Sequence, residues 1–321
     1  MSALGWARTR PPALRPGERR LAVNRLLRPF TGYALVLPAL AVLLLFFYLP
    51  AVLLFVIAFL HFQIAGSSTF AGLSNFTLLF AQPLFLKSLL VTGYFVVVMV
   101  PATLVLSLAL AMLVRDVARR GRRGGVTQAL IFLPHVTPLV ATSLIWVYIF
   151  NPQFGFLNFI IGQFTSTQPG WLNSTAWAMP AVMIYSLWHS VGLYMVLFLA
   201  GLAIIPDRLI EAAQVEGVTG FKAFRRVILP LLKPTMYLVC LLVTVNTLQT
   251  FAQIYTLTGG AYSHGGGPAF STTTDAVLIY QTAFQYFNFS LAAAMSLILF
   301  LILLAIMMIQ RWGFSRPGSG Q

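Results

Sequence analysis

The chain has 321 residues, of which 59% are hydrophobic and only 8% are charged, and its mean hydropathy is +0.87. Soluble domains carry about 25% charged residues, so this composition excludes an ordinary water-soluble protein and predicts one that lies in a bilayer. The net charge of +14 is also seen in nucleic-acid-binding proteins, but no binding module accompanies the basic residues, so we expect no nucleic-acid partner.

Six long apolar segments follow one another along the chain. A helix needs roughly 20 apolar residues to cross a bilayer, and we expect helices at about residues 31–60, 88–114, 127–150, 176–204, 232–257 and 286–310. The segments are continuously apolar rather than alternating, which favours helices over barrel strands. Four prolines are expected to kink these helices without ending them: Pro38, Pro101, Pro138 and Pro180. The sequence thus predicts an all-α membrane protein with one transmembrane domain at 31–310, between tails at 1–30 and 311–321.

The basic residues alternate with the predicted spans. Nineteen of the 20 Lys and Arg residues lie before the first span, between the second and third, between the fourth and fifth, or after the sixth, and only Lys87 lies on the other side. Positively charged loops stay in the cytoplasm. We therefore expect a multi-pass membrane protein with both termini in the cytoplasm.

One basic loop, at 206–234, is the longest charged and amphipathic segment between two spans. Pro206 can begin a helix, and Asp207 lies in its first turn, where a carboxylate favours the positive end of the helix dipole. Gly217 and Gly220 are expected to end it, and Thr219 to cap a second helix with one apolar face. On periodicity alone, this second helix is an ordinary interfacial helix that positions the fifth span.

The amino-acid sequence of this loop resembles a motif of a known protein family. EAAQVEG at 211–217 is followed nine residues later by VILP at 227–230. This resembles the EAA loop of permease subunits in binding-protein-dependent ABC importers, EAAxxxG and then IxLP, with Val227 in place of the isoleucine. The matching residues, with Glu216 between them, are Glu211, Ala212, Ala213, Gly217, Leu229 and Pro230. The resemblance extends over about 31–310 and is nearest to permeases for carbohydrates and glycerol 3-phosphate.

This resemblance implies the transmembrane domain of a type I ABC importer in a bacterial cytoplasmic (inner) membrane, with six spans and a cytoplasmic coupling loop that docks on an ATPase. The implied partners are a second permease subunit, two ATP-binding subunits, an extracytoplasmic binding protein and membrane lipid. The implied solute is a sugar or related polyol, with glycerol 3-phosphate or a derivative among the candidates. The segment at 265–277 resembles the loop that approaches the binding protein, or is a flexible connector. Two other functions stay open: an ion-coupled secondary carrier and a non-transporting membrane scaffold.

The chain itself lacks the residues of an ATPase. A phosphate-binding loop ends in GK[ST], and none of Lys87, Lys222 and Lys233 follows a glycine. The histidines are scattered without metal-ligand spacing, and we expect no carboxylate within a span, which disfavours an ion-coupled carrier. We therefore expect no catalytic residue, metal or cofactor in this chain, and ATP and Mg²⁺ to be used by its partners.

Two polar or aromatic stripes are candidates for the path of the solute. One, on the fifth span, consists of Asn246, Gln249, Thr250 and Gln253, which share a face of a helix. The other, on the fourth span, consists of Tyr185, Trp188, His189 and Gly192. Amide, hydroxyl and aromatic groups suit a polyhydroxylated solute. Hydrogen bonds between spans explain the first stripe equally well, and an aromatic stripe such as the second is more often packing than binding.

Overall fold

The computed structural model describes residues 33–63, 66–119, 121, 124–165, 168–259 and 266–315. The chain separates into two compact units, residues 1–56 and 57–321. Most described residues are helical, as predicted, and four helices are long and apolar enough to span a membrane, or six if each of two bent helix pairs counts as one span. The predicted tail at 1–30 and residues 316–321 of the predicted C-terminal tail lie outside the described residues.

A single apolar helix makes up the described part of the first unit. It begins at Tyr33 and continues to Ala58, just past the boundary between the units. It includes a π-helical turn at Leu44–Tyr48 (η1) and ends as α2, Leu49–Ala58. Nothing in its most apolar window is buried. An apolar surface of this length is stable only against lipid or another protein, as expected for a span.

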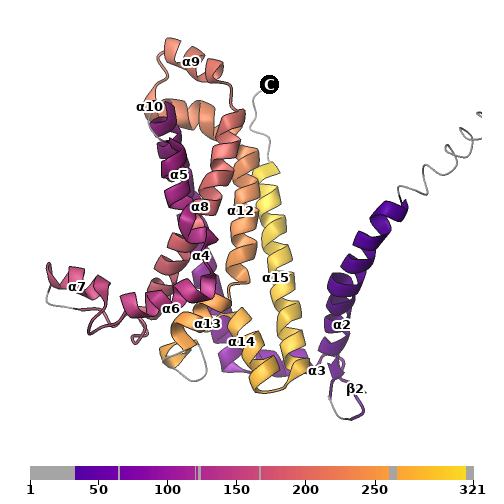
Figure 1. Cartoon of the computed structure of the whole chain (residues 1–321). Coiled ribbons are helices and arrows are strands. Elements are labelled where there is room, and N and C mark those ends of the chain that lie inside the picture. The colour runs from indigo at the N-terminus through magenta and orange to yellow at the C-terminus, as the bar shows by residue number, and fades with distance from the viewer. Residues whose placement is uncertain are drawn as a thin grey trace, which may run out of the picture. The chain divides into compact units, whose positions relative to one another are not determined.

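The second unit is a helical bundle (Figure 1). Its long helices are α4 (Pro83–Arg119), α5 (Gly124–Val136), α8 (Ala178–Ile204), α12 (Lys233–Leu248) and α15 (Phe289–Ser315). The central helix α8 packs against α4, α5 and α12, and α12 also packs against α15. Helices α9 (Asp207–Val215) and α10 (Gly220–Ala223) lie at one end of the bundle, and α7 (Phe156–Gly162), α13 (Ala252–Gly259) and α14 (Asp275–Tyr280) lie at the other.

The predicted third span is two helices. α5 ends at Val136 and α6 (Leu139–Ile149) leaves it at 94°. The prediction that Pro138 only kinks this span was therefore wrong. Pro138 has an extended ψ of 121°, and a proline also disfavours helical geometry in the residue before it. Pro101, by contrast, lies inside α4 without ending it.

The predicted fifth span is also interrupted. α12 ends at Leu248, residues 249–251 are not helical, and α13 begins at Ala252, so the prediction of one helix over 232–257 was wrong. Before it, α10 continues through a π-helical turn at Phe224–Ile228 (η2) into α11 (Leu229–Leu231), which meets α12 at 74°. The bend before α12 and the non-helical residues after it make α12 a short, separate helix.

Short elements close the end of the bundle that carries α7. Strands β1 (Leu60–His61) and β2 (Thr69–Phe70) form an antiparallel hairpin that the sequence did not predict. Helix α3 (Ser74–Phe80) follows it, and the buried Asn75 donates to the carbonyl oxygens of Ala58 and Leu60, each at 2.9 Å. A 3₁₀ turn, η3 (Pro268–Phe270), precedes α14, and the π-helical η4 (Gln281–Gln285) follows it.

Candidate functional site

A cavity of about 650 Å³ lies within the bundle, between α4, α5, α8 and the break that separates α12 from α13. Its polar lining comes mainly from α8 and from the break: Thr103, His135, Ser186, His189, Ser190, Tyr194, Asn246, Thr247, Gln249, Thr250 and Gln253. Apolar side chains such as Phe95 and Phe251 complete it. The volume and the mixture of apolar walls with a few polar groups are typical of sites for small molecules.

The break in the fifth span turns its polar residues towards this cavity. All four residues of the predicted stripe line it, although they do not lie on one continuous helix. Asn246 donates to the Tyr194 hydroxyl at 2.9 Å, and Gln253 donates to the Ser186 hydroxyl at 3.0 Å. The side chain of Thr250 donates to the carbonyl oxygen of Asn246 at 2.8 Å, which caps the end of α12.

Two histidines meet at the cavity wall. The ring centroids of His135, from α5, and His189, from α8, lie 5.5 Å apart. His189 Nε2 lies 3.4 Å from the carbonyl oxygen of Thr137. In the part of the chain that the structure describes, His135 Nδ1 and Thr103 Oγ1 are buried without a hydrogen-bond partner. Buried polar atoms are nearly always paired, so these two atoms mark positions where a bound solute or water can form hydrogen bonds.

Only one side chain of the predicted aromatic stripe lines the cavity, and that is His189. Tyr185 is fully buried, and its hydroxyl pairs with Thr142 Oγ1 at 2.9 Å and donates to the Leu139 carbonyl oxygen at 2.8 Å. It therefore ties α6 to α8. Trp188 packs on Trp146 with ring centroids 5.2 Å apart.

The α8 residues that do face the cavity were missed by sequence reasoning. Ser186, Ser190 and Tyr194 follow one another at four-residue spacing, which places them on one face of α8. This spacing was visible in the sequence, but the neighbouring face with Tyr185 and Trp188 was chosen instead. His135 had no such signal, because it reaches this wall through the packing of α5 against α8.

The charge of the cavity is low. None of its lining residues is Asp, Glu, Lys or Arg, and its ionisable side chains are His135, His189 and Tyr194. Amides and hydroxyls can exchange hydrogen bonds with sugar hydroxyls, whereas a dianionic phosphate calls for Arg or Lys. The lining therefore suits an uncharged polyhydroxylated compound better than a phosphorylated one.

The loop at 206–234 presents the EAA residues at the α9 end of the bundle. Ile210 and Ala213 of α9 are buried, whereas Glu211, Ala212 and Glu216 are exposed and Val215 is 90% exposed. The helix ends at Val215, two residues before the predicted breaker Gly217, whose φ is +78°, and Gly220 has a φ of +56°. Thr219 occupies the predicted cap position of α10 but makes no side-chain capping bond. Leu229 and Pro230 lie in α11, next to the bend into α12.

The loop that leads into α14 is anchored through buried polar residues. Asp275 is 1% exposed; its Oδ1 accepts from Ser88 at 2.5 Å, and its backbone N–H donates to Thr92 Oγ1 at 2.9 Å. Burial raises the pKa of the Asp275 carboxyl to about 6. Thr274 donates to the carbonyl oxygen of Thr250, at the helix break, at 3.4 Å. Residues 266–275 are thus tied to α4 and to the cavity, which disfavours a mere flexible connector.

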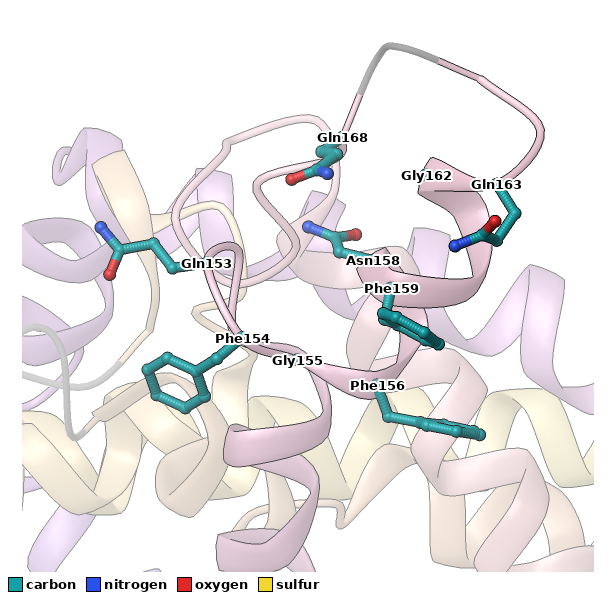
Figure 2. Close-up of a pocket in the computed structure, with 9 residues that line it drawn as sticks. All are labelled: Gln153, Phe154, Gly155, Phe156, Asn158, Phe159, Gly162, Gln163 and Gln168. Carbon is teal, nitrogen blue, oxygen red and sulfur yellow. The ribbon is translucent and has the colours of Figure 1, made fainter.

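A second hollow, of about 470 Å³, lies beside α7 (Figure 2). Asn158 shapes it, because this buried residue accepts from Trp171 at 2.8 Å and donates to the carbonyl oxygens of Pro152 and Pro169. In Figure 2 the rings of Phe154 and Phe156 extend in opposite directions. The aromatic groups therefore do not converge on this hollow, and the cavity within the bundle is the better candidate site.

Comparison with known proteins agrees with the geometry. Residues 104–316 match the protein family described as "Binding-protein-dependent transport system inner membrane component". The chain is 32% identical over 279 residues to the trehalose/maltose transport system permease protein MalF of Thermococcus litoralis, covering 85% of this chain and 90% of that protein. It is 31% identical over 277 residues to the sn-glycerol-3-phosphate transport system permease protein UgpA of Agrobacterium fabrum, covering 85% and 91%.

A lactose transport system permease protein, LacF of Rhizobium radiobacter, is 31% identical over 281 residues, covering 87% of this chain and 92% of that protein. Among solved structures, a chain of a bacterial alginate ABC transporter in complex with an alginate pentasaccharide-bound periplasmic protein superimposes with a TM-score of 0.79. This match covers 92% of the present chain and 98% of the other at 22% identity, and it shows that the two chains share a fold.

Proposed function

Since this chain belongs to the family of inner membrane components of binding-protein-dependent transport systems, we propose that it forms one half of the membrane pore of an ATP-driven importer for an uncharged sugar or polyol. The observation that carries the choice of solute is the cavity at the helix break, with its amides, hydroxyls and two histidines and without an acidic or strongly basic side chain. Broken helices that line a central cavity are a recurrent way to build substrate sites in membrane transporters.

The choice among solutes follows from charge. Relatives carry names that refer to trehalose/maltose, lactose and sn-glycerol 3-phosphate. The lining of the cavity matches the hydroxyl-rich members of this set, because Asn246, Gln249 and Gln253 offer both donors and acceptors. The residues proposed to contact the solute are therefore these three with Thr250 and His189, and Tyr185 and Trp188 are assigned to packing.

Coupling to ATP is proposed to pass through the loop at 206–234. Exposed Glu211, Ala212 and Glu216 would face a cleft of an ATPase subunit, and the positive φ at Gly217 sets the angle between α9 and α10. Because only the turn at 216–219 and the 74° bend at Leu232 lie between α9 and α12, a push on α9 can be transmitted to α12. The break that follows α12 then changes the shape of the cavity.

The proposed assembly contains this chain, a second permease, two ATP-binding subunits and an external binding protein. The basic loops, including α9, would lie in the cytoplasm with both termini. The end that carries α7 and α14 would face the binding protein, and residues 266–275 link that surface to the cavity. ATP and Mg²⁺ are assigned to the partner subunits. Membership of this family argues against an ion-coupled carrier and against a scaffold without transport.

The test is ATPase activity of the complete reconstituted complex in the presence of its binding protein. We expect neutral saccharides such as trehalose, maltose or lactose to stimulate hydrolysis, and Gln249→Leu to reduce that stimulation about tenfold or more, because a hydrogen bond to the solute is lost. Gln310→Leu is the matched control, since Gln310 lies in α15, away from the end that carries α7, and does not line the cavity. Stimulation by sn-glycerol 3-phosphate alone, or equal effects of the two changes, would contradict the proposed solute site.

A further inference from the structure

A third hollow, of about 600 Å³, lies at the α9 end of the bundle, where α4, α5 and α8 end. Its lining divides into two parts. One part is charged and consists of Arg115, Arg119 and Asp207. The other is apolar and includes Leu199, Ala203 and Pro206. The hollow therefore combines a charged mouth with an apolar wall.

Positive charge exceeds negative charge at the mouth. Oδ1 of Asp207 accepts from Nη2 of Arg115 at 3.2 Å and also from Nη2 of Arg119. Each guanidinium carries five N–H donors, so a single shared oxygen uses few of them. The side chain of Arg115 is 17% exposed and that of Arg119 is 45% exposed, which leaves the second guanidinium accessible from the hollow.

The accessible part of the apolar wall runs along one side of α8. Leu199 is half-buried and Ala203, one turn further on, is exposed, as is Pro206, whereas Val114 and Leu202 lie behind them at 3% and 1% exposed. A free inorganic anion would use only the arginines and leave Leu199, Ala203 and Pro206 uncovered. A molecule with an anionic head and an apolar tail would cover both parts. Basic pockets between span ends are known to suit anionic lipid head groups.

We propose that this hollow binds an anionic phospholipid, with its phosphate on Arg115 and Arg119 and an acyl chain along Leu199 and Ala203. A phosphate forms paired hydrogen bonds with guanidinium groups, so it competes with the carboxylate that already holds them. That carboxylate is Asp207, the first residue of α9. Lipid binding would thus release the start of the EAA helix from the end of α4. The proposal needs only the membrane location and does not depend on which solute is carried.

The test measures phosphatidylglycerol binding to the complete detergent-purified complex by native mass spectrometry, with phosphatidylcholine as the reference lipid. Arg115→Gln is expected to weaken binding of phosphatidylglycerol about fivefold, the effect of removing one cation from an anionic-lipid contact. Arg225→Gln is the matched control, because Arg225 is exposed on η2 and lies outside the hollow. Asp207→Asn is expected to strengthen binding, since it removes the competing carboxylate.

Three outcomes would overturn the proposal: equal binding by the Arg115→Gln and unaltered complexes, equal weakening by Arg225→Gln, or displacement of the lipid by inorganic phosphate at matched concentration. The last result would assign the hollow to a free anion. If the Arg115→Gln complex does not assemble, Arg119→Gln gives the same test at a more exposed position. Lipid binding is read directly in this experiment, so its failure leaves the proposed import function untouched, and a failed ATPase assay leaves the lipid site untouched.

Discussion

Asp275 is the acidic side chain most deeply buried in the described part of the chain, and its surroundings hold it by hydrogen bonds rather than by an ion pair. Ser88 and Thr92 of α4 supply the bonds to its side chain and backbone, and its Oδ2 is buried without a partner. Burial disfavours the ionised form, so the pKa of this carboxyl is raised to about 6. An unfolded aspartate titrates near about 3.9.

This difference predicts a pH dependence of stability. Because the folded protein binds the proton more tightly than the unfolded chain, the stabilisation is complete below about pH 4 and is lost as pH rises to about 6. Asp275→Asn stays neutral and should remove this slope and raise the thermal midpoint at neutral pH. Thermal unfolding of the detergent-solubilised complex across this range measures it. A slope that persists unchanged in Asp275→Asn would contradict the assignment.

At the scale of elements, the coupling loop depends on where its helices end. Just after α9, the N–H of Gly217 donates to the carbonyl oxygen of Gln214 at 3.0 Å, and the N–H of Val218 donates to the carbonyl oxygen of Ala213 at 2.8 Å. These bonds require the left-handed φ of +78°, which glycine adopts without strain. Nothing lies near the position of a Cβ at Gly217, so the constraint is conformational and not steric crowding.

Gly217→Pro is therefore expected to uncouple ATP hydrolysis from uptake while the protein remains inserted. Proline fixes φ near about −65° and removes the N–H that closes α9. Solute uptake and ATPase activity in proteoliposomes, measured on the same preparation, test this expectation. Gly313→Ala in α15 serves as the control, because its backbone φ is ordinary and its surroundings are open. Normal solute-dependent transport by Gly217→Pro would rule out the coupling role.

Close approach of α5 and α8 depends on Gly192. A Cβ there would collide with the backbone of Ile131 and Phe132. Gly192→Ala should push these helices apart and destabilise the bundle by about 1–3 kcal/mol, as overpacking does. Gly93→Ala is the comparison, since it lies inside α4 with open space around it. Equal thermal midpoints for the two variants would show that the α5–α8 contact tolerates expansion.

At the scale of the whole molecule, orientation in the bilayer follows from the basic loops, and one cysteine makes it measurable. The native Cys240 is buried, so labelling by a membrane-impermeant thiol reagent should give a low background. We expect Gln163→Cys, beside α7, to react in intact cells, and Glu216→Cys, in the EAA loop, to react only after permeabilisation. Both positions are exposed. The reverse pattern would invert the proposed topology.

Several features of the molecule could be predicted from composition and local pattern. Long uncharged segments predicted an all-helical membrane protein because backbone groups in hydrocarbon must pair within the segment. The sequence motif around Glu211 and Gly217 predicted the family. Gly217 adopts the positive φ that is typical of a glycine after the end of a helix. Each of these features depends on contacts within a few residues, which is why the sequence alone determined them.

The tertiary structure decided where the spans break and which side chains share the cavity. Pro138 separates α5 from α6, whereas Pro101 lies inside α4 without ending it. The fifth span is not helical at 249–251, where the carbonyl oxygen of Thr250 accepts a hydrogen bond from the Thr274 side chain. His135 faces His189 only because α5 and α8 pack together. Backbone groups freed at a break are stable in a membrane only when distant residues pair with them, so these features depend on packing between segments far apart in the sequence.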